Sequence, residues 1–143
     1  MRRTDHIEVV VIVLALLLSA GAAQADVVAV VSANSTVTTL SKNQVADIFL
    51  GKTTRFPDGS VVVPIDQAEG TLERNEFYIR FTGKSAAQIK AHWSKIIFTG
   101  RGQPPKALAN GIQIRKLLAQ NPHAIGYIER NMVDGSVKVL LQQ

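Results

Sequence analysis

The chain has 143 residues, 46% of them hydrophobic and 19% charged, with a formal net charge of +5 at pH 7. There is no cysteine, which excludes a disulfide framework and a lipoprotein attachment site. The basic balance favours anionic partners, but the basic residues are scattered and no aromatic stripe is interleaved with them, which argues against nucleic acid.

The N-terminal segment has the layout of a secretory signal peptide. A basic start, MRR, precedes an unbroken apolar run at Val9–Leu18, and residues 23–25 read AQA, an A-x-A cleavage pattern. The apolar run is shorter than the roughly 20 residues of a membrane span, so we expect cleavage after Ala25 rather than an uncleaved anchor. The predicted organisation is a signal peptide at 1–25 and one periplasmic domain at 26–143, which keeps 14 basic and 9 acidic residues and therefore a net charge of +5.

Strand and helix patterns alternate along the predicted domain. A β-branched run at 26–32 predicts a strand buried on both faces. Ser41 and Gln44 have the spacing of a capping box at the start of a helix. The remaining elements are a strand over 61–66, helices beginning near Thr71 and Ser85, a helix over 110–122, and strands over 124–129 and 137–141. This alternation predicts an α/β domain.

Apolar spacing within the helices indicates which side chains face the core. Phe77 and Phe81 are four residues apart, and a second stripe has offsets of four, seven and eight residues. This second stripe consists of Ile89, Trp93, Ile96 and Ile97. Its periodicity predicts that Trp93 belongs to the core rather than to the wall of a ligand site.

The sequence offers no pattern typical of an enzyme. His92 and His123, the histidines after residue 25, lie outside metal-ligand spacings such as H-E-x-x-H. There is also no G-x-S-x-G nucleophile elbow. We therefore predict a protein that is not an enzyme and that has no metal site and no cofactor.

Several segments, taken in order, give the chain a family resemblance. They are LSKNQVADIFLGKTTRFPDGSVVVPI at 40–65, EGT at 69–71, IFTGRG at 97–102 and NPHAIGYIE at 121–129. In this order they resemble the periplasmic phosphate-binding proteins of phosphate ABC transporters, in the type II periplasmic binding superfamily. The resemblance implies a mixed sheet flanked by helices, phosphate as ligand and an ABC transporter permease as partner. Full-length members have two lobes that close over the anion, so residues 26–143 correspond to about one lobe.

The anion motif of that family is only partly present. Its form is Arg-x-Asp-Gly-Ser-Gly-Thr, directly after a strand. When this pattern is laid over Gly70 and Thr71, the Arg, Asp and Ser positions hold Ile65, Gln67 and Glu69. The chain is therefore expected to be a short, single-lobe relative with a degraded signature.

The Gly70-Thr71 turn has two interpretations. A helix start has N–H groups without partners and a partial positive charge, so Gly70, Thr71 and Arg74 could hold an oxyanion. Alternatively, Thr71 is only the N-cap of its own helix and Gly70 makes the turn. Glu69 and Glu73 favour this second interpretation, because they would occupy the helix dipole and repel phosphate.

Ser35 and Thr36 are the next candidate ligand residues. They follow the first predicted strand, and ligands of doubly wound sheets lie outside the carboxyl ends of strands. The alternative is a polar surface connection with no ligand.

Two functions are consistent with the sequence. The first is a periplasmic solute-binding protein for phosphate or another small oxyanion, with Ser35, Thr36, Gly70, Thr71 and Arg74 as ligand residues. A homodimer or a partner protein would then supply the second wall of the site. The second is a ligand-free envelope interaction or accessory protein built on the same scaffold.

Overall fold

The computed structural model describes residues 25–140. The predicted signal peptide at 1–25 therefore lies outside the described residues, apart from Ala25. The described strands are β1 (Val27–Ser32), β2 (Val63–Gln67), β3 (Lys106–Leu108), β4 (Ala124–Glu129) and β5 (Val137–Val139). The helices are α2 (Lys42–Phe49), α3 (Leu72–Thr82), α4 (Ala86–Phe98) and α5 (Gly111–Gln120), with a 3-10 turn η1 (Arg130–Met132). No helix among these residues is both long and apolar enough to cross a membrane.

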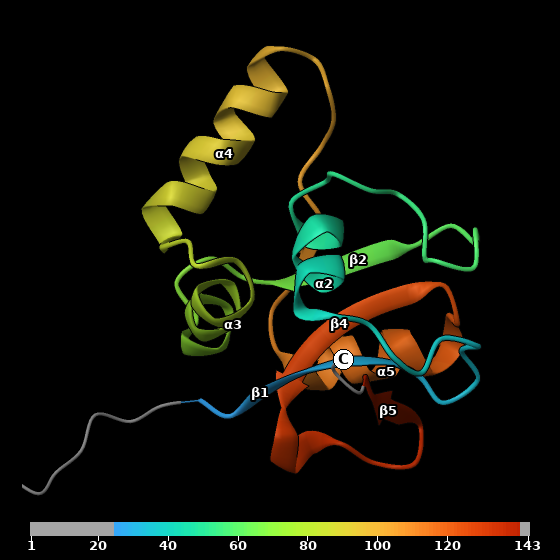
Figure 1. The fold of residues 1–143 in the computed structure, drawn as a ribbon. Coiled ribbons are helices and arrows are strands. Elements are labelled where there is room, and N and C mark those ends of the chain that lie inside the picture. The colour runs from blue at the N-terminus through green and yellow to red at the C-terminus, as the bar shows by residue number, and fades with distance from the viewer. Residues whose placement is uncertain (1–24, 141–143) are drawn as a thin grey trace, which may run out of the picture.

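The strands form one mixed sheet in the order β3-β2-β4-β1-β5 (Figure 1). β2 runs parallel to β3 and β4, whereas β1 is antiparallel to β4 and β5. Val27 lies opposite Glu129, and Val63 lies opposite Ala124. The carboxyl ends of β2 and β4 therefore share one edge of the sheet with the start of β1, and β1 ends at the opposite edge. This α/β sheet with flanking helices confirms the predicted fold class.

The two faces of the sheet carry separate apolar clusters. All six residues of β1 are buried, as the β-branched run predicts. Its alternate residues Val27, Ala29 and Val31 pack with α2, α3 and α4, while Val28 and Val30 pack with α5. The first cluster centres on Phe77, whose ring stacks on that of Tyr127 at 4.0 Å between centroids.

The predicted helix starts are confirmed. The side chain of Ser41 accepts from the amide of Gln44, and Gln44 accepts from the amide of Ser41, which completes the capping box of α2. Ser85 forms the same arrangement with Gln88 at the start of α4. Local side-chain chemistry therefore sets where these helices begin.

Two features differ from the sequence prediction. The predicted apolar stripe of α4 is buried only at Ile89 and Trp93, while Ile97 is exposed. The reason is that the end of α4 extends past the body of the domain, where Ile96 is still partly buried against the first cluster but Ile97 is not (Figure 1). The short edge strand β3 has no strand pattern in the sequence, and its three residues are mostly exposed.

Gly51, which follows α2, contacts Trp93 so closely that a larger residue will not fit. Its φ is +74°, and a Cβ added there would lie 2.8 Å from the Cη2 atom of Trp93. We expect Gly51→Ala to lower the free energy of unfolding by about 1–3 kcal/mol in urea denaturation, because it combines left-handed backbone strain with overpacking. Gly59→Ala is the control, since Gly59 also has a positive φ but a Cβ there would meet no atom within 4 Å. Equal losses in the two variants would show that the contact with Trp93 contributes nothing.

Candidate functional site

The start of α3 lies at the edge where β2 and β4 end. Gly70 makes the turn with a φ of +91°. The hydroxyl of Thr71 accepts from the amide of Arg74 at 3.3 Å and donates to the carbonyl of Ala68 at 2.9 Å. Thr71 is therefore the N-cap of α3, and its hydroxyl proton is used within the turn.

Several amides at this helix start have no acceptor in the described part of the chain. The structure gives no hydrogen bond from the amides of Gly70, Leu72 and Glu73 to any residue of 25–140. Leu72 and Glu73 occupy the first two helical positions, where intrahelical acceptors do not exist. These N–H groups and the helix dipole are the features by which a helix start binds an oxyanion.

A pocket of about 310 Å³ is lined by Thr71 and Glu73 of this helix start. It lies between the start of α3, the start of α5 and the end of β4. Its polar lining includes Gln67, Thr71, Glu73, Asn110 and Glu129. A small ion or solute would fit in this space.

The charge of this pocket is acidic. Glu73 and Glu129 both line it, one from the first turn of α3 and one from the end of β4. A hydrogen bond with Glu73, with smaller contributions from desolvation and from the charge of Glu73, raises the pKa of the Glu129 carboxyl. When both groups are ionised they repel each other and any anion in the pocket.

Arg74 directs its guanidinium inward rather than into this pocket. Its Nη1 atom donates to the carbonyl of Gln67 at 3.1 Å and lies 3.8 Å from a carboxylate oxygen of Asp66. The guanidinium carbon lies 5.5 Å from the ring centroid of Tyr78. The side chain is only 18% exposed, so the guanidinium is largely withdrawn from solvent.

A buried carboxylate at the end of β2 is the feature that sequence reasoning missed. Asp66, 2% exposed, accepts hydrogen bonds from the hydroxyls of Tyr78, at 2.5 Å, and Tyr127. The amide of Gln67 donates to the same carboxylate at 2.9 Å. Burial, followed by the negative charge of Asp66, raises the pKa of both tyrosines, which therefore stay protonated as donors. The sequence did contain a signal for this network: a charged residue stands within an apolar strand, and two tyrosines occupy buried positions elsewhere.

Gln67 is also used within the fold. This residue stands at the Asp position of the phosphate-binding motif. Its side-chain amide donates to the carbonyl of Tyr127 at 2.9 Å, which ties β2 to β4. Its side chain is buried at the base of the pocket rather than extended into it.

Ser35 and Thr36 lie at the opposite edge of the sheet. Because β1 is antiparallel to β4, its carboxyl end lies at that opposite edge. The expectation that ligands lie outside the carboxyl ends of the strands therefore does not place this loop at the pocket. Ser35 accepts from the amide of Val37 at 3.1 Å, and Thr36 donates to Asp58 at 3.1 Å. The five predicted ligand residues therefore fall into two separated groups. Ser35 and Thr36 form one, and Gly70, Thr71 and Arg74, at the start of α3, form the other.

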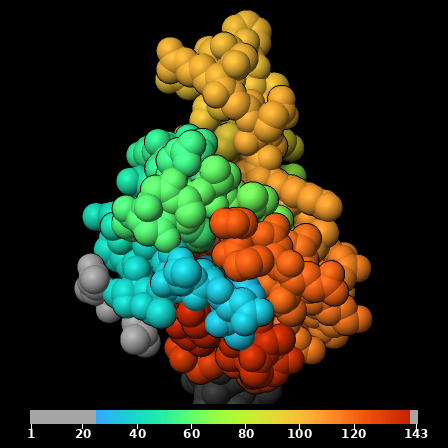
Figure 2. All heavy atoms as spheres, turned by 90° about the vertical axis from the view of Figure 1, so that its right-hand side faces the viewer, coloured from blue at the N-terminus to red at the C-terminus, as the bar shows by residue number. Residues whose placement is uncertain are grey.

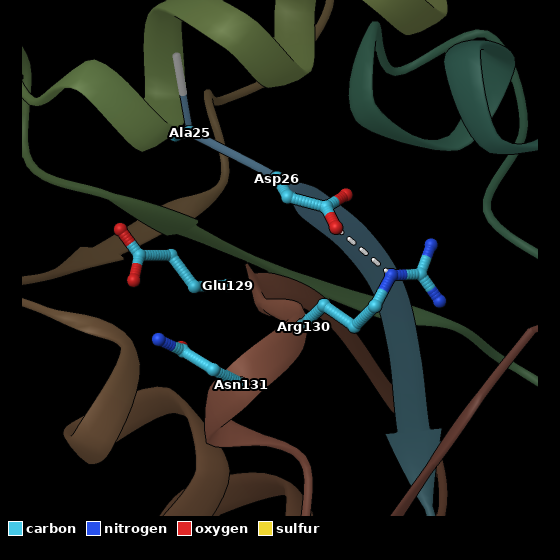
Figure 3. Close-up of a pocket in the computed structure, with 5 residues that line it drawn as sticks. All are labelled: Ala25, Asp26, Glu129, Arg130 and Asn131. Atoms are coloured by element: carbon cyan, nitrogen blue, oxygen red, sulfur yellow. Dashed lines mark hydrogen bonds and ion pairs between the residues drawn. The ribbon is translucent and has the colours of Figure 1, made fainter. Parts of the chain in front are cut away.

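A second hollow, of about 400 Å³, adjoins the first where β1 begins and β4 ends (Figure 3). Glu129 lines both. Arg130 turns away from Glu129 and forms an ion pair with Asp26, at 3.0 Å between Nε and the carboxylate (Figure 3). Arg74 and Arg130 are thus both paired with carboxylates, and the charged residues that line the first pocket are Glu73 and Glu129.

Solved structures share this fold, a mixed sheet flanked by helices. The chain matches a protein of Clostridium perfringens assigned as a phosphate ABC transporter substrate-binding protein and solved with bound phosphate. The TM-score is 0.65 and the identity 22%, over 81% of this chain and 44% of that one. An ABC-type phosphate transport receptor of Vibrio cholerae matches with a TM-score of 0.63 and 19% identity, over 81% and 45% of the two chains. PstS of Borrelia burgdorferi matches with a TM-score of 0.57 and 14% identity, over 83% and 47%.

These similarities establish the fold. The chain spans less than half the length of the proteins it matches, as expected for one lobe. The similar structures are binding proteins rather than enzymes. No protein-family model matches the chain, and no curated protein matches it.

Proposed function

We propose that this chain is a solute-binding protein of the periplasm that takes a small oxyanion such as phosphate at the start of α3. The observation that carries the proposal is the helix start itself. The amides of Gly70, Leu72 and Glu73 lack acceptors in the described residues, and Thr71 and Glu73 line a pocket of about 310 Å³. The Clostridium perfringens structure, which holds phosphate, supports the choice of anion. A phosphate ABC transporter is the corresponding partner.

Binding is expected to be weak in the isolated chain. One lobe encloses an ion from one side only, so part of the ion stays in contact with water. Glu73 and Glu129 add an unfavourable charge, and Arg74 is held inward by Asp66 and the carbonyl of Gln67. The test is isothermal titration of residues 26–143 with phosphate at low ionic strength, with sulfate as the comparison anion. Saturable heat with phosphate supports the proposal.

Thr71→Ala tests whether the anion lies at this helix start. The substitution should lower the free energy of unfolding by about 1 kcal/mol, the usual loss for an N-cap. It should also weaken phosphate binding several-fold, because the cap fixes the orientation of the first amides of α3. Ser85→Ala is the control, since the side chain of Ser85 also caps a helix, as part of a capping box at the start of α4, but does not line the pocket. An unchanged dissociation constant in Thr71→Ala would remove the start of α3 from the binding site.

A second candidate function is a ligand-free interaction or accessory protein of the cell envelope. Leu72 and Ile112, which are 59% and 46% exposed, lie at the starts of α3 and α5; Ile112 lines the acidic pocket, and Leu72 stands between Thr71 and Glu73, which line it. Apolar side chains next to two carboxylates suit a protein partner better than a phosphate ion. The absence of heat with either anion, at protein concentrations that detect millimolar affinity, would favour this function.

A further inference from the structure

The second half of α4 stands clear of the domain. The helix is held at its middle, where Ile89 and Trp93 are buried and the Nε2 atom of His92 donates to the carbonyl of Leu50 at 2.9 Å. Beyond Trp93 the helix extends away from the sheet, and the chain returns through residues 99–105 to β3 (Figure 1). Figure 2 shows the end of α4 and this loop as a knob that projects from the rest of the molecule. We call residues 95–101 the α4 tip.

The α4 tip exposes two large apolar side chains. Phe98 is 93% exposed, more than any other large hydrophobic residue among those the structure describes, and Ile97 is 49% exposed. They are consecutive and close the last turn of the helix. An exposed apolar pair at a projecting point, rather than in a groove, forms a wedge.

The charges around this wedge are all positive. Residues 77–128 contain no aspartate or glutamate, although they include eight lysines and arginines. Lys90, Lys95 and Arg101 are exposed on α4 and in the loop that follows it. The acidic residues belong instead to 26–76 and 129–143, so α4 and the loop that follows it carry positive charges only.

We propose that the α4 tip binds the surface of a bilayer that contains anionic lipids. Ile97 and Phe98 enter the boundary between headgroups and acyl chains, while Lys95 and Arg101 contact the anionic headgroups. An apolar wedge flanked by cations is the chemistry of interfacial membrane binding. Two apolar side chains are too few for a stable protein interface, which buries about 800 Å² on each partner. Binding at the tip does not depend on a ligand at the start of α3.

The test is flotation of residues 26–143 with vesicles at low ionic strength. One set of vesicles contains phosphatidylglycerol and phosphatidylcholine in equal amounts, and the other contains phosphatidylcholine alone. We expect binding to the first set only, with a loss of affinity on adding salt. Phe98→Ser should weaken this binding about five- to tenfold, from the lost apolar insertion. The double variant Lys95→Gln/Arg101→Gln should weaken this binding by about tenfold or more, because each removed charge loses roughly one contact with an anionic headgroup.

Ile79→Ser is the matched control, because Ile79 is 55% exposed on α3 but lies away from the α4 tip. It should bind vesicles as the parent chain does. Circular dichroism should show that all of these variants fold, since the substituted side chains are exposed. A failure to bind anionic vesicles would overturn the proposal and leave an acidic protein surface as the occupant to test. Equal binding by Phe98→Ser and the parent chain would also overturn it.

Discussion

Asp66→Ala is expected to lower the free energy of unfolding by about 3–5 kcal/mol, the range for removing one partner from a buried charged network. The substitution would leave the hydroxyls of Tyr78 and Tyr127 buried without their acceptor. Arg74 would also lose the carboxylate that lies 3.8 Å away. Urea denaturation of residues 26–143 measures the effect directly, from the shift of the midpoint at constant slope.

Asp58→Ala provides the comparison for this measurement. Asp58 also accepts hydrogen bonds, from Ser60 and Thr36, but it is exposed in a surface turn. Its substitution should lower the stability much less than Asp66→Ala does, because exposed interactions contribute little. A loss below about 1 kcal/mol for Asp66→Ala would contradict the view that this carboxylate organises the end of β2.

The Asp66 network also explains why the edge of β2 keeps its shape without the phosphate-binding motif. Ile65 and Gln67, at the Arg and Asp positions of that motif, are both buried here. Ile65 packs against α5, and Gln67 bonds to Tyr127. These two β2 residues therefore contribute to the buried interior, and the free amides of the turn are what remains for a ligand.

Most of the fold was predictable because its signals are local. The capping boxes at Ser41 and Ser85 and the β-branched run of β1 each act over a few residues. The N-cap of α3 at Thr71 was predictable for the same reason. Such signals locate element starts without knowledge of the tertiary structure.

The arrangement of the candidate site was less predictable, because it depends on the direction of β1. Strand pairing is non-local, and the sequence pattern of β1 is the same whether it runs parallel or antiparallel to β4. The antiparallel pairing of Val27 with Glu129 moves Ser35 to the edge away from Gly70. In the same way, the exposure of Ile97 depends on where α4 leaves the domain rather than on its periodicity.

Glu73→Gln/Glu129→Gln is expected to strengthen phosphate binding by about tenfold or more. A unit charge about 4 Å from an anion opposes binding by about 1 kcal/mol in water and by about 4 kcal/mol where the effective dielectric constant is near 20. Both carboxylates line the pocket beside the free amides, so their removal leaves the helix start as the dominant charge. Isothermal titration with phosphate at pH 7 measures the change. Glu69→Gln is the control, because Glu69 is exposed and does not line this pocket.

The pH dependence of anion binding should follow from the same pair of carboxylates. The pKa of Glu129 is raised by its hydrogen bond with Glu73, so its proton is retained above the usual range for a glutamate. Lowering the pH from 7 to 5 brings it closer to the raised pKa of Glu129, so this carboxylate carries less negative charge. The affinity of the parent chain for sulfate, whose charge is constant over this range, should therefore rise. The double glutamine variant should show no such rise. A raised pKa also means that the contribution of Glu129 to stability is fully present below its unfolded pKa and is lost as pH rises through its folded pKa. Equal sulfate affinities at both pH values in the parent chain would place the anion away from Glu73 and Glu129, and hence away from the start of α3.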